Sequence, residues 1–157
     1  MRREFGKFMV DIAEKDDKVF LIIGDIGFGI FDEYRKRFPN RFINIGICEQ
    51  SMIGIAAGMA LQGLKPYVYT ITPFLIERPF EQIKIDIDIN NVNVKLIGYD
   101  DYPTQGPTHD INNIETLMKH FKNIKSFFPS NQKETREMLT KMYNTISPCF
   151  IRLKRSK

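Results

Sequence analysis

The sequence predicts an α/β fold, a doubly wound, mainly parallel six-stranded sheet with helices on both faces. Short apolar runs alternate along the chain with segments whose apolar residues recur every three or four positions. The apolar runs are almost uninterrupted, as in strands that are covered on both faces. The chain has 157 residues, of which 43% are hydrophobic and 27% charged, which is typical of one globular domain.

The amino-terminal segment predicts a helix, a strand, a second helix and a second strand, in that order. The helix over Arg2–Glu14 is predicted because its apolar residues lie three or four positions apart, at Phe5, Phe8, Met9 and Ile12. The run VFLIIG (19–24) is apolar and ends in Gly, which predicts a buried strand. A polar helix over 31–38 and the strand RFINI (41–45) follow.

The middle of the chain continues the alternation. A helix of small residues is predicted over Glu49–Gln62, and the run KPYVYTI (65–71) predicts the third strand. We expect TITPFLIERPFEQ to be a loop that leads into a helix over Phe80–Ile89. That helix places Phe80, Ile83 and Ile87 on one side.

The last third predicts three strands and two helices. The strands are 92–98, 124–128 and 149–153, and the helices are 114–120 and 132–145. A long loop rich in Tyr, Asp, Gly and Pro follows the first of these strands. The sequence has no internal repeat, linker or low-complexity segment, so residues 1–157 are expected to form a single domain.

Charge and cysteine content argue against several classes of protein. The net charge is +4, but Lys and Arg are scattered and cluster only at 154–157, which favours a solvated tail over a nucleic-acid surface. Cys48 and Cys149 lack the spacing of a metal or redox site, and we interpret both as reduced core thiols. No segment is apolar enough for a signal peptide or a membrane span, so we expect a cytoplasmic protein.

Ligands of doubly wound sheets bind in the loops beyond the carboxyl ends of the strands. These loops contain GDIGFG, NIGICEQ, TITPFLIERPF and YDDYPTQGPTH. GDIGFG lacks the third glycine of a dinucleotide fingerprint. Glu49 stands at the opening of its helix, where an acidic residue also stabilises the helix dipole. Glycines at 54 and 58 weaken a helix interior, so we expect close approach of another backbone to this helix.

The stretch NIGICEQSMIGIAAGMALQGLKPYVYTITPFL resembles the pyrimidine-binding domain of transketolase-like thiamine diphosphate enzymes, which include transketolase and deoxyxylulose-phosphate synthase. The resemblance extends through YDDYPTQGPTHDINNIETLMKHFKNIKSFFPSNQKETREML to PCFIRL and covers nearly the whole chain. It implies the thiamine diphosphate-binding fold. It also implies a transferase of carbohydrate metabolism that carries a two-carbon ketol unit from a ketose or ketose phosphate.

The resemblance assigns roles to the second and third loops. Glu49 matches the glutamate that bonds to the cofactor's aminopyrimidine ring and activates it, and Ile47 belongs to the same cofactor-binding block. Phe74 matches the aromatic residue that stacks on the aminopyrimidine, with core packing as the alternative. Phe80 is a second candidate, although it also fits the start of a helix that packs inside. Arg78 either faces a substrate phosphate or pairs with Glu77 or Glu81.

The fourth loop resembles the family's D-G-P-T-H block. His109 matches the histidine that binds substrate and handles protons near the reacting carbon, whereas His120 is expected at the surface. Gln105 stands where the family has an acid that contacts the sugar, so ordinary ketose-phosphate recognition is in doubt unless Asp100, Asp101 or Asp110 compensates. In the first loop, Asp25 matches an acid near the active-site entrance, and a helix cap is an equal alternative.

The family's diphosphate-binding domain and third domain have no counterpart here. The resemblance therefore implies a separate diphosphate-binding subunit that carries Mg²⁺, two copies of each chain, and active sites between the two kinds of subunit. No metal site is expected on this chain.

Other functions stay open at this point. One is a subunit of a two-chain 2-oxo acid decarboxylase, against which the GPTH block argues. Another is a non-catalytic interaction module that kept the fold. A receiver-like signalling domain lacks its paired acids after VFLIIG.

Overall fold

The computed structural model describes residues 1–100 and 105–154 of the chain. The six strands form one parallel sheet in the order β2-β1-β3-β4-β6-β5. The predicted doubly wound parallel sheet is therefore confirmed. The strands are β1 (Val19–Ile23), β2 (Phe42–Asn44), β3 (Lys65–Ile71), β4 (Lys95–Asp100), β5 (Lys125–Phe127) and β6 (Cys149–Lys154).

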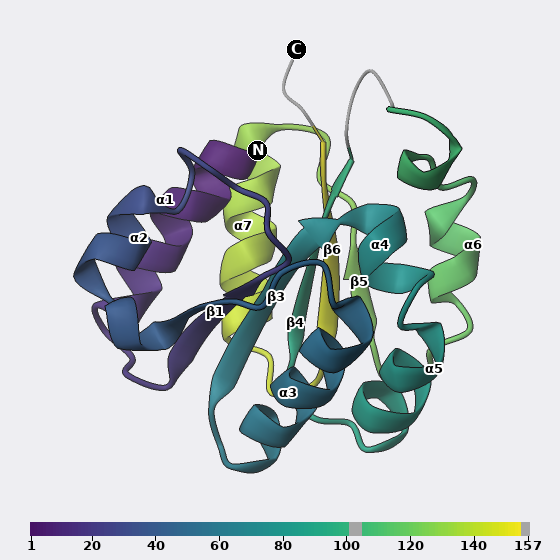
Figure 1. Cartoon of the computed structure of the whole chain (residues 1–157), viewed down its shortest axis with the longest axis horizontal. Helices are drawn as coiled ribbons and strands as arrows, with labels where there is room; N and C mark the ends of the chain where they lie inside the picture. The colour runs from purple at the N-terminus through teal and green to yellow at the C-terminus, as the bar shows by residue number, and fades with distance from the viewer. Residues whose placement is uncertain (101–104, 155–157) are drawn as a thin grey trace.

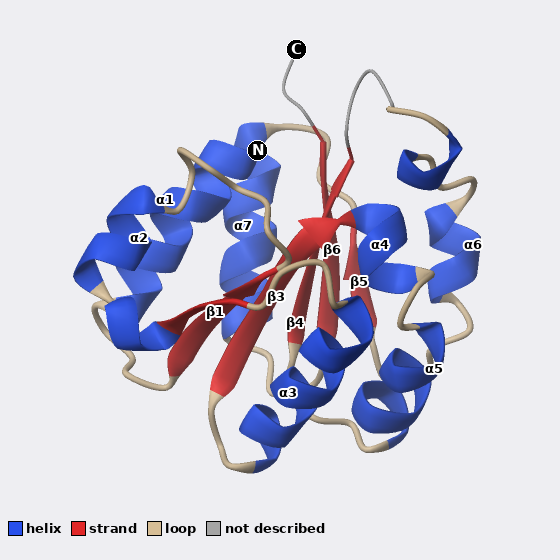
Figure 2. Ribbon diagram, viewed as in Figure 1, coloured by secondary structure: helices blue, strands red, loops and turns tan. Residues whose placement is uncertain are grey.

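The helices cover both faces of the sheet (Figure 1). One face carries α1 (Arg2–Ala13), α2 (Asp32–Arg37) and α7 (Gln132–Tyr143), with the short 3₁₀ turn η1 (Pro39–Arg41) before β2. The other face carries α3 (Glu49–Leu61), α4 (Thr72–Ile76), α5 (Phe80–Gln82), the π-helix η2 (Ile83–Ile89) and α6 (Ile114–Met118). A further 3₁₀ turn, η3, spans Pro107–His109. Figure 2 shows how helices and strands alternate along the chain.

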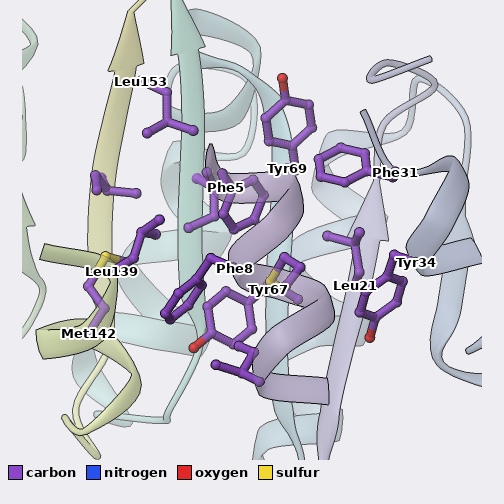
Figure 3. Close-up of a cluster of buried hydrophobic side chains, with 14 of the residues drawn as sticks. Phe5, Phe8, Leu21, Phe31, Tyr34, Tyr67, Tyr69, Leu139, Met142 and Leu153 are labelled. Atoms are coloured by element: carbon purple, nitrogen blue, oxygen red, sulfur yellow. The ribbon is translucent and has the colours of Figure 1, made fainter. Parts of the chain in front are cut away.

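Each face of the sheet has its own hydrophobic core. Figure 3 shows the core under α1 and α7, where Phe5 stacks on Tyr69 at a ring separation of 5.8 Å and meets Phe31 edge to face. The second core lies under α3, η2 and α6 and contains Met52, Ile83 and other fully buried aliphatic residues. The two cores fix both faces of the sheet, and the carboxyl ends of its strands therefore form a rigid platform.

Three sequence-based expectations were wrong. The segment after β3 is not a loop throughout, because Thr72–Ile76 forms α4, with Pro73 in its first turn. The fourth strand begins at Lys95 rather than Val92, since the Val92 amide still donates to Ile87 at the end of η2. Cys48 is exposed on the turn between β2 and α3, whereas Cys149 is buried as expected.

The long loop after β4 begins with residues 101–104, and Asp101 therefore lies outside the described residues. Among the helices of residues 1–100 and 105–154, none combines the length and apolar character that crossing a membrane requires.

Candidate functional site

Glu49 lies at the first turn of α3, just beyond the carboxyl end of β2. The chain makes this connection in four residues, and Gly46 turns it with a φ of +76° that other residues rarely adopt. Only 5% of the Glu49 side chain is exposed. A carboxylate at this position is favoured by the helix dipole, but its burial requires a compensating donor or cation.

Arg78 supplies that cation. Its Nη1 donates to Oε1 of Glu49 at 2.8 Å. The carbon at the centre of the same guanidinium lies 3.6 Å from the centroid of the Phe74 ring. The flat cation is therefore held by a carboxylate and by an aromatic ring. Arg78 therefore pairs with Glu49 and not with Glu77 or Glu81, which was one of the two alternatives that the sequence left open for it.

The position of Phe74 follows from how α4 packs on the sheet. Thr72 opens α4 and donates from Oγ1 to Oδ1 of Asp100, at the end of β4, over 2.6 Å. Gly98 lets α4 come this close, because a Cβ at Gly98 would lie 2.7 Å from the Thr72 hydroxyl. Phe74 is half-buried two residues further along, so its ring is set by the contact between α4 and β4.

His109 completes the group from the last loop. It ends η3, which follows Gly106 with a φ of +110°. The imidazole meets the Phe74 ring at a centroid separation of 4.8 Å and an angle of 67° between the planes. The structure thus brings Glu49, Arg78, Phe74 and His109 into one chain of contacts, although they follow three different strands, β2, β3 and β4.

The other predicted site residues have different surroundings. Ile47 is 66% exposed and, with Glu49 and Arg78, lines an open hollow of about 500 Å³. Phe80 begins α5 and packs on Phe121 at 5.0 Å, which is the alternative that the sequence left open for it. Gln105 is exposed, and so is His120, as predicted.

Asp25 contacts Asn44, the last residue of the neighbouring strand β2. It has a φ of +53°, and its amide and carboxylate pair with the side-chain amide of Asn44 at 3.1 and 3.0 Å. Asn44 also accepts from the Gly46 amide. This Asp25–Asn44 pair therefore fixes the turn that leads to Glu49, and Asp25 does not cap a helix as the sequence alternative suggested.

A cationic hollow was missed by sequence reasoning. It has a volume of about 800 Å³ and lies at the carboxyl edge of the sheet, where Arg2, Arg3, Lys7 and Lys154 line it together with Tyr99. Arg2 is anchored there, because its Nε donates to the Tyr69 hydroxyl at 2.7 Å and its guanidinium lies 3.9 Å from the Tyr99 ring centroid. Arg2, Arg3 and Lys7 open the chain, whereas Tyr99 and Lys154 come from β4 and β6, so no single stretch of the sequence indicates the hollow.

Within residues 1–100 and 105–154, no three or more His, Cys, Asp or Glu side chains gather as a metal ion would require. The site is therefore built from a buried carboxylate, an aromatic ring, a histidine and an arginine. It suits a flat organic group that carries hydrogen-bond donors in its plane.

The chain is similar to parts of transketolases and of related enzymes. Relatives include a subunit of the apulose-4-phosphate transketolase of Actinobacillus succinogenes, which is 43% identical over 122 residues that cover 75% of this chain and 39% of the relative. The 1-deoxy-D-xylulose-5-phosphate synthase of Syntrophomonas wolfei is 33% identical and covers 96% of this chain, but only 24% of its own length is matched. The chain thus spans well under half of these relatives.

A solved structure has the same fold. It is a split gene transketolase in the form of an inactive beta4 tetramer, with a TM-score of 0.89 and 31% identity. The match covers 99% of this chain and 50% of that one. The family described as the transketolase pyrimidine binding domain matches residues 1–157. The chain therefore belongs to the transketolase pyrimidine-binding domain family.

Proposed function

We propose that the chain is the pyrimidine-binding subunit of a split, thiamine diphosphate-dependent transketolase. The proposed reaction transfers a two-carbon ketol unit from a ketose or ketose phosphate. Membership of the family supports a thiamine diphosphate-dependent transferase as the class. The substrate and the roles of individual residues are our proposal.

The proposal rests on one observation, which is that a buried carboxylate and an aromatic ring both contact the same flat cation. Glu49 is 5% exposed and bonds in the plane of a guanidinium that lies over Phe74. An aminopyrimidine is also flat and carries a ring nitrogen that a carboxylate can bond. The residues present therefore fit the aminopyrimidine half of the cofactor.

Thiamine diphosphate, when bound, supplies the carbon nucleophile for making or breaking a bond beside a carbonyl group. Glu49 would bond the aminopyrimidine ring nitrogen, and a proton held between them would favour the activated tautomer. Phe74 would orient the ring by stacking. His109, at the edge of Phe74, would bind substrate and hold a proton next to the reacting carbon.

A substrate with a phosphate group is supported by the cationic hollow. Arg2, Arg3, Lys7 and Lys154 form a positive surface at the same edge of the sheet that carries the carboxyl ends of β4 and β6. Such a surface attracts anionic groups. Substitution of Arg3 and Lys7 by Ala should raise the KM for a phosphorylated donor. The KM for an unphosphorylated ketose should stay unchanged. If both KM values change equally, this surface does not recognise the phosphate.

A separate diphosphate-binding subunit is supported by the outer face of α3. The expected close approach finds no partner within the described residues, since a Cβ at Gly54 or Gly58 would meet nothing within 4 Å. Ile55 and Leu61 on α3 are exposed, as are Ile85 and Ile89 on the adjacent η2. A helix that is apolar all round is normally buried. We propose that the partner subunit covers this face and carries Mg²⁺, with two copies of each chain.

Calorimetric titration of thiamine diphosphate and Mg²⁺ tests the proposal, with this chain alone and with a candidate diphosphate-binding chain. Binding should be tight only in the mixture. Glu49→Gln should then lower the transketolase rate of the mixture roughly a hundredfold or more. Glu137→Gln, a change at an exposed carboxylate of α7 on the other face of the sheet, is the matched control and should keep the rate.

Three results of these titration and rate measurements would contradict the proposal or a part of it. A verified complex that binds no thiamine diphosphate would favour an interaction module that kept only the fold. A Glu49→Gln complex with the full rate would remove the activating role of this residue. Turnover of a 2-oxo acid without ketol transfer would favour the decarboxylase alternative.

A further inference from the structure

Arg78 occupies the place that a flat cationic ligand needs. Its guanidinium is planar, carries N–H donors in that plane, and lies between the Phe74 ring at 3.6 Å and the Glu49 carboxylate at 2.8 Å. These are the two contacts, stacking and an in-plane hydrogen bond, on which the proposed aminopyrimidine site depends. Both cannot be made by Arg78 and by a ligand at the same time.

We propose that Arg78 is an internal occupant of a planar-cation site, and that a flat ligand with in-plane N–H donors binds by displacing it. The ligand class comprises guanidinium, amidinium and aminopyrimidine groups. The inference rests on the proposed function for the last of these, but the site itself is defined by Glu49, Phe74 and Arg78. Arg78 thereby excludes flat ligands without N–H donors, because such a ligand cannot replace the bond of Arg78 to Glu49.

The surroundings allow the displacement. The Arg78 side chain is 40% exposed, whereas Glu49 is 5% exposed, so the arginine covers the carboxylate from the solvent side. The open hollow of about 500 Å³ beside Arg78 gives the guanidinium room to turn away. Glu77 and Glu81 are exposed and close in sequence, and they offer carboxylates to the displaced cation. The Arg78 backbone need not move, and its carbonyl accepts from Gln50 Nε2.

The strength of the internal contacts sets the expected effect. A partly exposed ion pair and a cation–π contact together favour the occupied site by about tenfold. The apparent dissociation constant of a ligand rises by the reciprocal of the fraction of chains whose site is free. Removal of the Arg78 guanidinium should therefore tighten ligand binding roughly tenfold.

The test uses the full chain and methylguanidinium as a probe, followed by backbone amide NMR shifts of Glu49 and Gln50. Arg78→Ala should bind methylguanidinium about tenfold more tightly than the wild-type chain. Arg78→Met keeps the aliphatic stem and should do the same. Arg37→Ala is the matched control, because Arg37 is 38% exposed and pairs with Glu14 and Glu33 on another surface. The gain should vanish in Arg78→Ala/Glu49→Gln.

Titration with thiamine diphosphate separates this inference from the proposed function. In one outcome, Arg78→Ala binds methylguanidinium, but thiamine diphosphate binds neither to the Arg78 variants nor to the complex with the diphosphate-binding chain. The internal site then stands and the cofactor assignment fails. If the complex binds thiamine diphosphate while Arg78→Ala and Arg78→Met bind methylguanidinium no better than the wild-type chain, the occupancy by Arg78 is refuted and the proposed function stands.

Discussion

The protein should become more stable as the pH rises toward about 9, because the buried Lys95 loses its proton in the folded state. Lys95 is 1% exposed at the start of β4 and donates from Nζ to the carbonyl oxygens of Thr145 and Ser147 at 2.7 and 2.8 Å. Its Nζ also lies 3.6 Å from Cys149 Sγ. Burial lowers the pKa of Lys95 from 10.5 to about 8, since removal from water disfavours the charged form. The perturbation that tests this is Lys95→Met.

The sign follows from proton binding. Below about pH 8 the lysine is charged in both states, and the folded state bears the full penalty of a buried charge. Above that pH the folded chain has lost the proton while the unfolded chain keeps it up to its pKa of 10.5. The unfolded state then binds more protons, so stability rises with pH. From about pH 7 to about pH 9, the free energy of unfolding should rise by about 1 kcal/mol relative to Lys95→Met.

Cys149 limits this window at its upper end. Burial raises the pKa of its thiol above 9.0, so the folded chain keeps this proton longer than the unfolded chain and stability falls as the pH rises beyond that value. The measurement is urea unfolding at several pH values between about 7 and 9, for the wild-type chain, Lys95→Met and the exposed control Lys84→Met. A wild-type curve that stays parallel to that of Lys95→Met would refute the reasoning.

Three further substitutions test the parts of the fold that hold the loops. The buried carboxylate of Asp88 accepts hydrogen bonds from three backbone amides before β5. Asp88→Ala should therefore lower the free energy of unfolding in urea by about 3 kcal/mol, and Asp86→Ala should not. Equal losses in the two variants would refute the role of these bonds. Gly98→Ala should destabilise by about 1–3 kcal/mol, since its Cβ would press on the Thr72 hydroxyl, and an unchanged thermal midpoint would contradict this packing. Asn131→Ala removes the side-chain cap of α7 and should lower the unfolding free energy by about 1 kcal/mol; no change would mean that the cap is dispensable.

The regular elements could be predicted from the sequence because their signals are local. The helix over Arg2–Ala13 follows the spacing of its apolar residues, and the strand Lys65–Ile71 has the bounds that the run KPYVYTI predicted. The strand order in the sheet has no such signal, since it depends on the crossovers. α4 was missed because Pro73 and Thr72 are typical of loops, and only the contact of Thr72 with Asp100 and Gly98 reveals why a helix forms there.

The candidate site residues could be named from the sequence, but their arrangement could not be predicted. Glu49, Phe74 and His109 were found through motifs, and motifs do not show which side chains touch. Arg78 has two acidic neighbours along the chain, yet it pairs with Glu49, 29 residues away. The reason is burial, because a carboxylate that has lost its water gains more from a cation than the exposed Glu77 and Glu81 do. Sequence spacing carries no information about that difference.

The same difference in burial makes the Glu49 site demanding toward any ligand. A group that takes the place of Arg78 must compensate a carboxylate that is 5% exposed, so it must donate a hydrogen bond or carry positive charge. It must also be flat, because it replaces a guanidinium stacked 3.6 Å from the Phe74 centroid. A neutral flat ligand without donors would leave Glu49 unpaired, at a penalty comparable to the stacking it gains. If the proposed site is correct, Glu49 would select an aminopyrimidine over other aromatic rings, while Phe74 alone would accept any of them.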